Sequence, residues 1–191
     1  MNCFTRPRSA AALVIATLVL ALAPMSGRAQ LLSFPDWYTL ADAAANNKAG
    51  AVAYLLNRGE NPNFVDSIGH SPLDYAATFG NAQMLHLLLN GGARVDYRDS
   101  LGDTALHWAA ERGQLDAIRI LVSAKAPIDA QNKQGITPLM LAAGADKAAA
   151  VKELLKAGAD RTKQDFTGRD ALGWAAGHAA ALQALQSTKA G

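Results

Sequence analysis

Five side chains of this 191-residue sequence are the best suited to chemistry: His70, His86, His107, His178 and Cys3. No two histidines have the i,i+4 spacing of a zinc-binding helix with a glutamate between them. Ser71 shows no sequence signal of an activating base, and we find no phosphate-binding glycine loop and no Cys-x-x-Cys pair. We therefore expect no catalytic residue, no metal ligand and no cofactor, and we predict that the protein is not an enzyme. His70 and His178 remain candidates for contact with a ligand.

The residues around these histidines belong to a pattern that recurs every 33 residues. The register is kept by glycines, leucines and alanines: Gly69, Gly102, Gly135 and Gly168; Leu40, Leu73, Leu106, Leu139 and Leu172; Ala43, Ala76, Ala109, Ala142 and Ala175. A fixed period of about 20 to 50 residues indicates an architecture of stacked repeats. Copies of one small structural unit must therefore position the candidate residues.

Each copy begins with a turn and a first helix. A residue whose side-chain oxygen can cap a helix precedes this helix, and the four copies have Ser71, Thr104, Thr137 and Asp170 there. Pro72 and Pro138 fill the first helical position, where a missing N–H costs nothing. Gly80 and Gly113 are suited to end the helix in a left-handed conformation. The turn before it is predicted by an aspartate three residues ahead of a glycine, at Asp66, Asp99 and Asp165.

A second helix follows in each copy. Its apolar residues share one helical face, as do Ala117, Ile118, Leu121 and Val122. Glycines end it, namely Gly59, Gly92 and Gly158. One unit is therefore a turn, a helix, a second turn, a second helix and a hairpin loop.

The repeated segments resemble the ankyrin signature G-x-T-P-L-H-x-A-A. They read GHSPLDYAA at 69–77, GDTALHWAA at 102–110, GITPLMLAA at 135–143 and GRDALGWAA at 168–176, and the unit ends GGARVDYR and GADRTKQ resemble the family's closing segment. The resemblance covers about 34–187. It implies an all-α solenoid of about five helix-turn-helix units joined by hairpin loops, with degenerate end caps, and a general role in protein binding. It also implies that His107, in the TALH segment, makes structural hydrogen bonds between repeats.

The predicted organisation has a signal peptide and five repeats. The ranges are 1–29 for the signal peptide, 30–65 for a degenerate N-terminal repeat opened by a capping box at Ser33 and Asp36, 66–98, 99–131 and 132–164 for three full repeats, and 165–191 for a truncated capping repeat with its tail. Three positions depart from the repeat pattern. Asp146 and Ala179 stand where the first helix should end in glycine, and Lys125 stands where the second helix should. We expect the final helix to run from Ala179 to about Gln186.

Residues 1–29 have the composition of a secretory signal peptide. Arg6 and Arg8 precede an apolar run of 14 residues, 10–23, and small residues at 27 and 29 suit cleavage before Gln30. An uncleaved membrane anchor is the alternative, but the run is shorter than the roughly 20 residues that span a bilayer. We therefore expect a periplasmic protein or, alternatively, a secreted one, with no stable membrane anchor after cleavage.

The charge balance gives no sign of a nucleic-acid or membrane-surface partner. The chain has 18 basic and 16 acidic residues. Cleavage would remove three arginines and no acidic residue, so that 15 basic residues would face 16 acidic ones and the net charge would be −1. We find no basic stripe for nucleic acid and no polybasic membrane patch. The expected partner is another protein, of unknown identity, bound by a monomer.

The family resemblance also implies where that partner binds. In ankyrin repeats the hairpin tips and the exposed end of each first helix line a concave groove. Carried onto this sequence, those positions predict protein-binding residues at Ile68, His70, Phe79, Leu101, Asp103, Glu111, Arg112, Ile136, Phe166 and Arg169. The alternative for the apolar members is packing against the next hairpin. Trp108 and Trp174, beside the alanine pairs, are predicted to be packing residues.

Three roles fit such a binding module. The first is a general adaptor for another exported protein. The second is an inhibitor or immunity protein that neutralises a toxin or an enzyme in the periplasm. The third is an accessory factor for a periplasmic stress-response enzyme.

Overall fold

The computed structural model describes residues 38–187, and all regular structure in that range is helical. The predicted signal peptide, the start at Gln30 and the expected capping box at Ser33 and Asp36 lie outside the described residues. Within this range no helix is both long and apolar enough to cross a membrane. The helices are α2 (Leu40–Ala45), α3 (Ala49–Asn57), α4 (Pro72–Phe79), α5 (Ala82–Asn90), α6 (Ala105–Arg112), α7 (Leu115–Ser123), α8 (Pro138–Gly144), α9 (Ala148–Lys156), α10 (Ala171–Trp174) and α11 (Ala179–Ser187).

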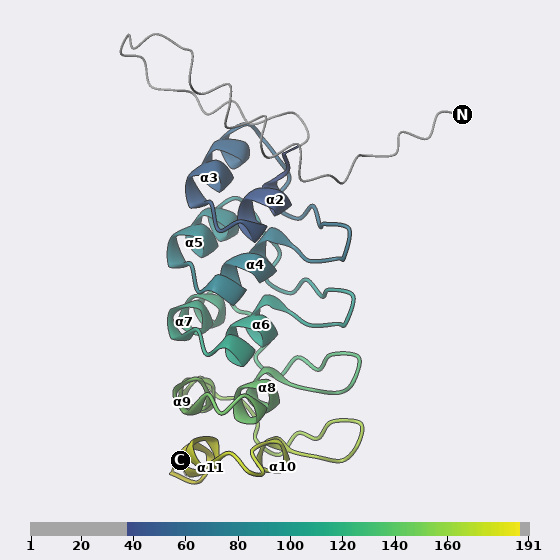
Figure 1. Ribbon diagram of the computed structural model, residues 1–191, viewed down its shortest axis with the longest axis vertical. Helices are drawn as coiled ribbons and strands as arrows, with labels where there is room; N and C mark the ends of the chain where they lie inside the picture. The colour runs from purple at the N-terminus through teal and green to yellow at the C-terminus, as the bar shows by residue number, and fades with distance from the viewer. Residues whose placement is uncertain (1–37, 188–191) are drawn as a thin grey trace, which may run out of the picture. The chain divides into compact units, whose positions relative to one another are not determined.

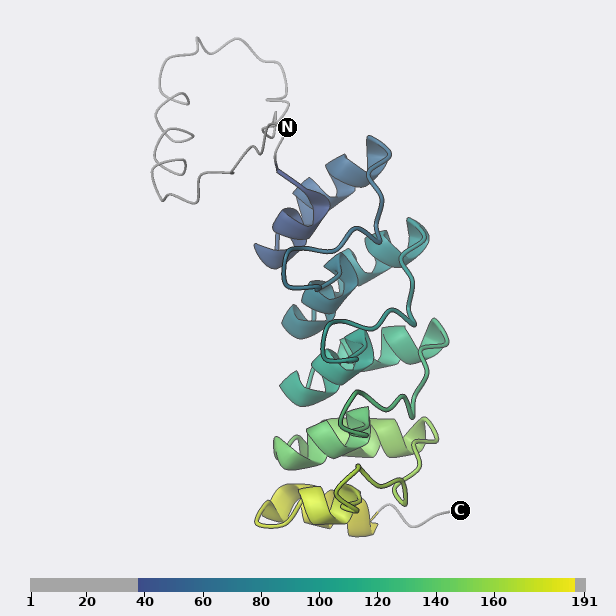
Figure 2. The ribbon, with the colours of Figure 1, turned by 90° about the vertical axis from the view of Figure 1, so that its right-hand side faces the viewer.

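The helices form pairs that stack one after another (Figures 1 and 2). The first helices, α2, α4, α6, α8 and α10, make one layer, and the second helices, α3, α5, α7, α9 and α11, make another. The hairpin loops project on the side of the first helices (Figure 1). Each predicted repeat range contains one helix pair. The predicted all-α solenoid of helix-turn-helix units is confirmed.

The first helices begin at the predicted caps. Ser71 Oγ accepts a hydrogen bond from Asp74 N, and Asp74 Oδ2 accepts one from Ser71 N at 2.8 Å, which satisfies two N–H groups that a helix start leaves unpaired. Asp170 likewise accepts from Gly173 N at 2.8 Å. A capping box at Thr39 and Asp42, not predicted from the sequence, starts α2.

The turn residues that depart from the repeat pattern adopt the conformation that glycine has elsewhere. Asp146 (φ 53°) and Lys125 (φ 67°) are both left-handed. In the last unit Gly177 (φ 88°) makes this turn, so the expectation that Ala179 replaces the turn glycine is wrong. Helix α10 ends early, at Trp174, so the turn comes two residues earlier in the chain than the 33-residue register predicts. Ala179 then becomes the first residue of α11. The predicted final helix is therefore confirmed, with one added residue.

Small and branched apolar residues fill the space between units. The signature leucines Leu73, Leu106 and Leu139 are at most 1% exposed, and the alanine pairs that follow them are fully buried. Alanines let neighbouring first helices approach closely, and each buried leucine contributes about 1.5–3 kcal/mol. In α7, Ile118 and Leu121 are fully buried as predicted. The core thus runs through the stack, between the layer of first helices and the layer of second helices.

Candidate protein-binding surface

One side-chain oxygen shapes the base of each hairpin. Asp99 Oδ1 accepts hydrogen bonds from the backbone N–H groups of Leu101 and Asp103, at 2.8 and 2.9 Å. The same pair of bonds is made by Asp66, Asn132 and Asp165 in the other hairpins. Such side-chain bonds to the backbone two residues on are what favours aspartate and asparagine in turns. The predicted turns at the three aspartates are confirmed.

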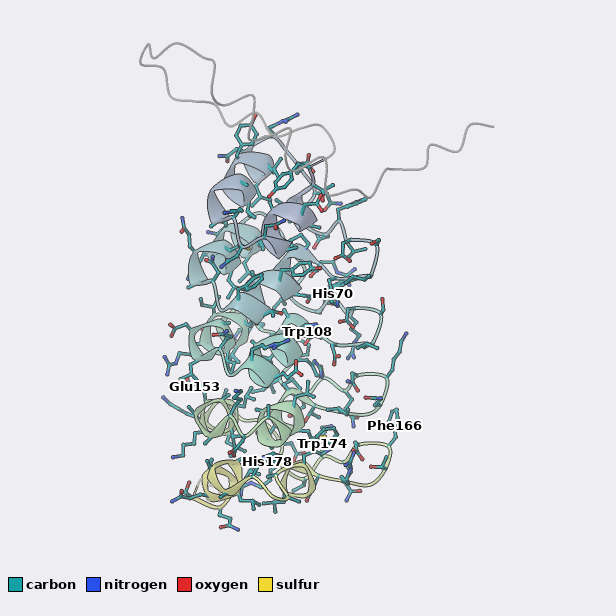
Figure 3. The ribbon with its side chains drawn as sticks, in the orientation of Figure 1. His70, Trp108, Glu153, Phe166, Trp174 and His178 are labelled. Carbon is teal, nitrogen blue, oxygen red and sulfur yellow. The ribbon has the colours of Figure 1, made fainter. Side chains whose placement is uncertain are left out.

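The second oxygen of each aspartate bonds to an aromatic side chain nine residues later, on the first helix. Trp108 Nε1 donates to Asp99 Oδ2 at 3.1 Å, and Trp174 Nε1 donates to Asp165 Oδ2 at 2.9 Å. Tyr75 O–H donates to Asp66 Oδ2 at 2.5 Å. All three rings are half-buried, and Figure 3 shows Trp108 and Trp174 on the first helices, on the side from which the hairpins project. Trp108 and Trp174 therefore pack as predicted, but they also tie each hairpin to the helix that follows it.

The fourth unit shows that this aspartate and its aromatic partner change together. The aromatic position holds Leu141, which cannot donate a hydrogen bond, and the turn position holds Asn132. Asn132 Nδ2 instead donates to Asp103 Oδ1 at 2.8 Å, in the preceding hairpin. The signal that could have revealed this pairing was in the sequence: three Asp-to-aromatic spacings of nine residues, and a joint replacement in the fourth unit.

These bonds lower the pKa values of two hairpin carboxylates, Asp66 and Asp165. The hydrogen bond from the Thr167 hydroxyl is the largest influence on Asp165 and, helped by Trp174, holds its pKa well below the usual range. Desolvation raises the pKa of Asp66, but the hydrogen bonds from Tyr75 and from the backbone of His70 and Ile68 outweigh it, so the net shift is downward. The negative charges of Asp66 and Asp165 are thus satisfied by donors of the chain itself.

The structure exposes most of the predicted binding residues. The exposed fractions are 75% for Phe166, 59% for Leu101, 58% for Ile68 and 43% for Phe79. Arg112 and Arg169 are exposed, and His70 and Glu111 are half-buried. Figure 3 places Phe166 on a hairpin and Glu153 on the opposite side of the stack, with the second helices.

Two predicted binding residues are buried, which corrects the expectation that they lie on the surface. Ile136 is 6% exposed and Asp103 is 7% exposed. The Ile136 carbonyl lies 3.1 Å from His107 Nε2, and the Asp103 carboxylate accepts the bond from Asn132. Both residues therefore join neighbouring units instead of facing a partner. For Ile136 the alternative of packing within the stack is the right one.

His107 has the predicted structural role. Thr104 N donates to its Nδ1 at 3.1 Å, so Nε2 carries the proton and donates to the Ile136 carbonyl of the next unit. Desolvation lowers the pKa of His107 and keeps the ring neutral. This ring is therefore part of the interface between repeats.

His70 lies among aromatic side chains on the hairpin side. Its ring makes edge contacts with Tyr75 and Trp108, at centroid distances of 5.5 and 5.2 Å. Its Nε2 is 3.7 Å from Asp99 Oδ2. His70 is half-buried and lies close to Trp108 on the side of the first helices and hairpins (Figure 3).

An open hollow of about 450 Å³ lies toward the end of the first-helix layer. It is lined by Glu111, Leu141, Gly144, Ala145, Trp174 and His178. Gly144 and Ala145 stand where the preceding unit has Glu111 and Arg112, so the small side chains leave the space open. The Arg169 guanidinium stacks on Trp174 at 4.6 Å from the ring centroid, a favourable cation–π contact. His178 therefore lines the hollow together with Trp174, and Arg169 contacts the same tryptophan ring.

No group of three metal-binding side chains is brought together among residues 38–187. In comparisons with known proteins, the family described as ankyrin repeats (3 copies) matches residues 40–132 and 124–190. No match was found among the curated proteins.

Proposed function

Because this chain belongs to the ankyrin-repeat family, whose repeats generally mediate protein–protein interaction, we propose that it is a non-catalytic module that binds another protein. The binding surface is formed by the hairpin tips and the exposed ends of the first helices. We name this surface the hairpin face and define it by Ile68, His70, Phe79, Leu101, Glu111, Arg112, Phe166 and Arg169.

The exposed apolar side chains of the hairpin face carry this proposal. Within residues 38–187, six large apolar side chains are exposed, and four of them are Ile68, Phe79, Leu101 and Phe166. Apolar side chains at a surface cost free energy unless something covers them. Aromatic and arginine side chains are the residues most often found as anchors of protein interfaces. Their concentration on one side of the stack favours a protein partner there.

The charged residues on the hairpin side also favour the hairpin face as the binding surface. Asp66, Asp99 and Asp165 are engaged by hydrogen bonds from their own hairpins and helices. Arg112 is exposed and makes no ion pair with any other described residue. An apolar strip with a free arginine at its edge has the anatomy of a protein interface, which has an apolar centre and a polar rim.

We further propose that the protein works in the periplasm. The support is the charged start, the apolar run and the small residues before Gln30. N-terminal sequencing of the protein from a periplasmic fraction should give Gln30 or a neighbouring residue. Retention of residues 1–29 in a membrane fraction would overturn this part of the proposal.

The binding proposal is tested by capture from a periplasmic extract with three baits. They are the parent protein, a Phe79→Ala, Arg112→Ala double variant, and Lys152→Ala, which changes an exposed residue of α9 among the second helices. We expect a protein retained by the parent and by Lys152→Ala to be lost from the double variant. If all three baits retain the same proteins equally, the hairpin face is not the binding surface.

A further inference from the structure

The hollow of about 450 Å³ in the first-helix layer lies where the fourth unit departs from the repeat pattern. Leu141 stands where the second, third and fifth units have an aromatic ring, and Gly144 and Ala145 stand where the second and third units have larger side chains. The third unit bounds the hollow through Glu111, and the fifth unit bounds it through Trp174. Small side chains in the fourth unit therefore open a space that a side chain of a bound protein can enter.

Glu111 brings a carboxylate without a partner to the wall of this hollow. It is half-buried, and no hydrogen bond or ion pair joins its side chain to another described residue. Glu153, by contrast, accepts hydrogen bonds from Nε and Nη2 of Arg119 at 3.0 and 3.2 Å. A protein that covers the hollow removes water from Glu111, and a desolvated carboxylate costs free energy unless a donor replaces the water. The hollow therefore favours an occupant that donates hydrogen bonds.

Trp174 gives the hollow a wall that is compatible with a positive charge. Its ring already holds the Arg169 guanidinium at 4.6 Å from the centroid, and an aromatic ring attracts a cation through its electron-rich face. The charge of Arg169 is balanced within its own unit, because its Nη2 lies 3.3 Å from Asp165 Oδ2. Arg169 therefore does not add an unbalanced positive charge beside the hollow.

We propose that the hollow receives a basic side chain, an arginine or a lysine, of the protein that binds the hairpin face. The positive end pairs with Glu111, and the aliphatic stem packs on Leu141 and Ala145, since long basic side chains can bury their stems along apolar surface. An acidic side chain would be repelled by Glu111, and an apolar one would leave that carboxylate unpaired. The hollow belongs to the proposed binding surface, so the proposal rests on the proposed function and adds the chemistry of one partner residue.

Amides of single amino acids test the chemistry of the hollow without a partner. N-acetyl-arginine amide is titrated onto the full chain, and N-acetyl-citrulline amide, which has nearly the same shape but no charge, is the matched control probe. We expect the arginine probe to shift the indole N–H resonance of Trp174 in a saturable way, and to bind about fivefold more tightly than the citrulline probe. Trp108 does not line the hollow, so its indole resonance is the internal reference.

Two variants change the hollow itself. Glu111→Gln keeps the size of the side chain and removes its charge, so it should weaken binding of the arginine probe about fivefold. Ala145→Phe, which copies Phe79 of the second unit, fills the hollow and should abolish the saturable shift. Glu153→Gln is the matched control, since it removes the same charge on α9, among the second helices (Figure 3), and should bind the probe as the parent does. Circular dichroism melts check that each variant keeps its fold.

A parent chain that does not bind the arginine probe, or that binds both probes equally, overturns the proposal. So does a folded Glu111→Gln variant that binds the arginine probe, or a captured partner protein, as tightly as the parent. None of these results affects the capture experiment with the Phe79→Ala, Arg112→Ala double variant, which tests the hairpin face on its own. If that capture fails while the probe preference holds, the proposed function is wrong and the chemistry of the hollow is right.

Discussion

Trp108 donates its indole N–H to the buried Asp99 carboxylate across 3.1 Å, and that carboxylate in turn holds the hairpin before the helix on which Trp108 lies. Hairpin and first helix are thus fixed to each other by one charged group with three donors. The arrangement recurs with Tyr75 and Asp66 and with Trp174 and Asp165. It explains how exposed loops can present a binding surface of defined shape.

The bond between Trp108 and Asp99 should be measurable as a coupling energy. We expect Trp108→Leu to destabilise the protein by about 1.5–3 kcal/mol through loss of a hydrogen bond to a charged group, in addition to lost packing. In an Asp99→Asn background, which copies the Asn132 and Leu141 combination, the same change should cost at least about 1 kcal/mol less. Urea melts of the four proteins give the cycle. Equal costs in both backgrounds would contradict the pairing.

Asp74 should make the protein less stable as the pH rises from about 4 to about 7. Burial is the main cause that raises its pKa from 3.8 to about 7, and its Oδ1 has no hydrogen-bond partner among the described residues. Between these values the folded chain holds a proton that the unfolded chain has released, so stability falls with increasing pH. Each pKa unit corresponds to about 1.4 kcal/mol, so the total effect is on the order of a few kcal/mol.

Asp74→Asn should remove this pH dependence and stabilise the protein at about pH 8. His107 contributes with the opposite sign, because burial lowers its pKa and its stabilisation is lost as the pH falls below about 6.5. The comparison must therefore be made between variant and parent at each pH. Urea melts at pH 5 and pH 8 that show the same difference between variant and parent at both values would contradict this account.

Lys125 should be a site of local strain. Its left-handed backbone (φ 67°) costs a residue with a Cβ about 1–2 kcal/mol, and the corresponding positions hold Gly92 and Gly158. We expect Lys125→Gly to raise the free energy of unfolding by about 1 kcal/mol. The matched control is Gly158→Lys, which should lower it by a similar amount although no atom of the described residues lies within 4 Å of the added Cβ. A lowered melting temperature for Lys125→Gly would be the contrary result.

Leu121→Ala tests whether the stack has the continuous core described here. Leu121 is fully buried in α7, so truncation should cost about 2–5 kcal/mol through lost burial and a cavity. Leu101→Ala, on an exposed hairpin, should change stability by less than about 0.5 kcal/mol. Chemical denaturation of both variants decides the point. A similar loss in the free energy of unfolding for the two variants would be inconsistent with a continuous core.

The fold could be predicted from the 33-residue period because each unit repeats its caps, glycines and apolar positions. The turns at Asp66, Asp99 and Asp165 and the buried face of α7 followed from local rules that need no knowledge of neighbouring units. The end of α10, the first helix of the last unit, did not follow from these rules. The 33-residue register pointed to Ala179, but removal of one partial turn of helix put the turn at Gly177.

The candidate site was only partly predictable because exposure depends on the neighbouring unit. Ile136 and Phe166 both stand at variable positions of their repeats, yet the structure buries the first and exposes the second. Ile136 lies against His107 of the preceding unit, whereas most of Phe166 extends beyond the hairpin that precedes it. Contacts between positions in different units are set by the stacking geometry, which a repeat pattern alone does not contain.

Binding through the hairpin face is tested by a calorimetric titration of a captured partner protein onto single variants of this chain. Phe79→Ala and Arg112→Ala should each weaken binding by more than about 1 kcal/mol, roughly a fivefold rise in Kd, with melting temperatures near that of the parent. Lys152→Ala, among the second helices, should bind as the parent does. Unchanged affinity for both hairpin-face variants, together with weakened binding by Lys152→Ala, would place the binding surface on the opposite side of the stack, with the second helices.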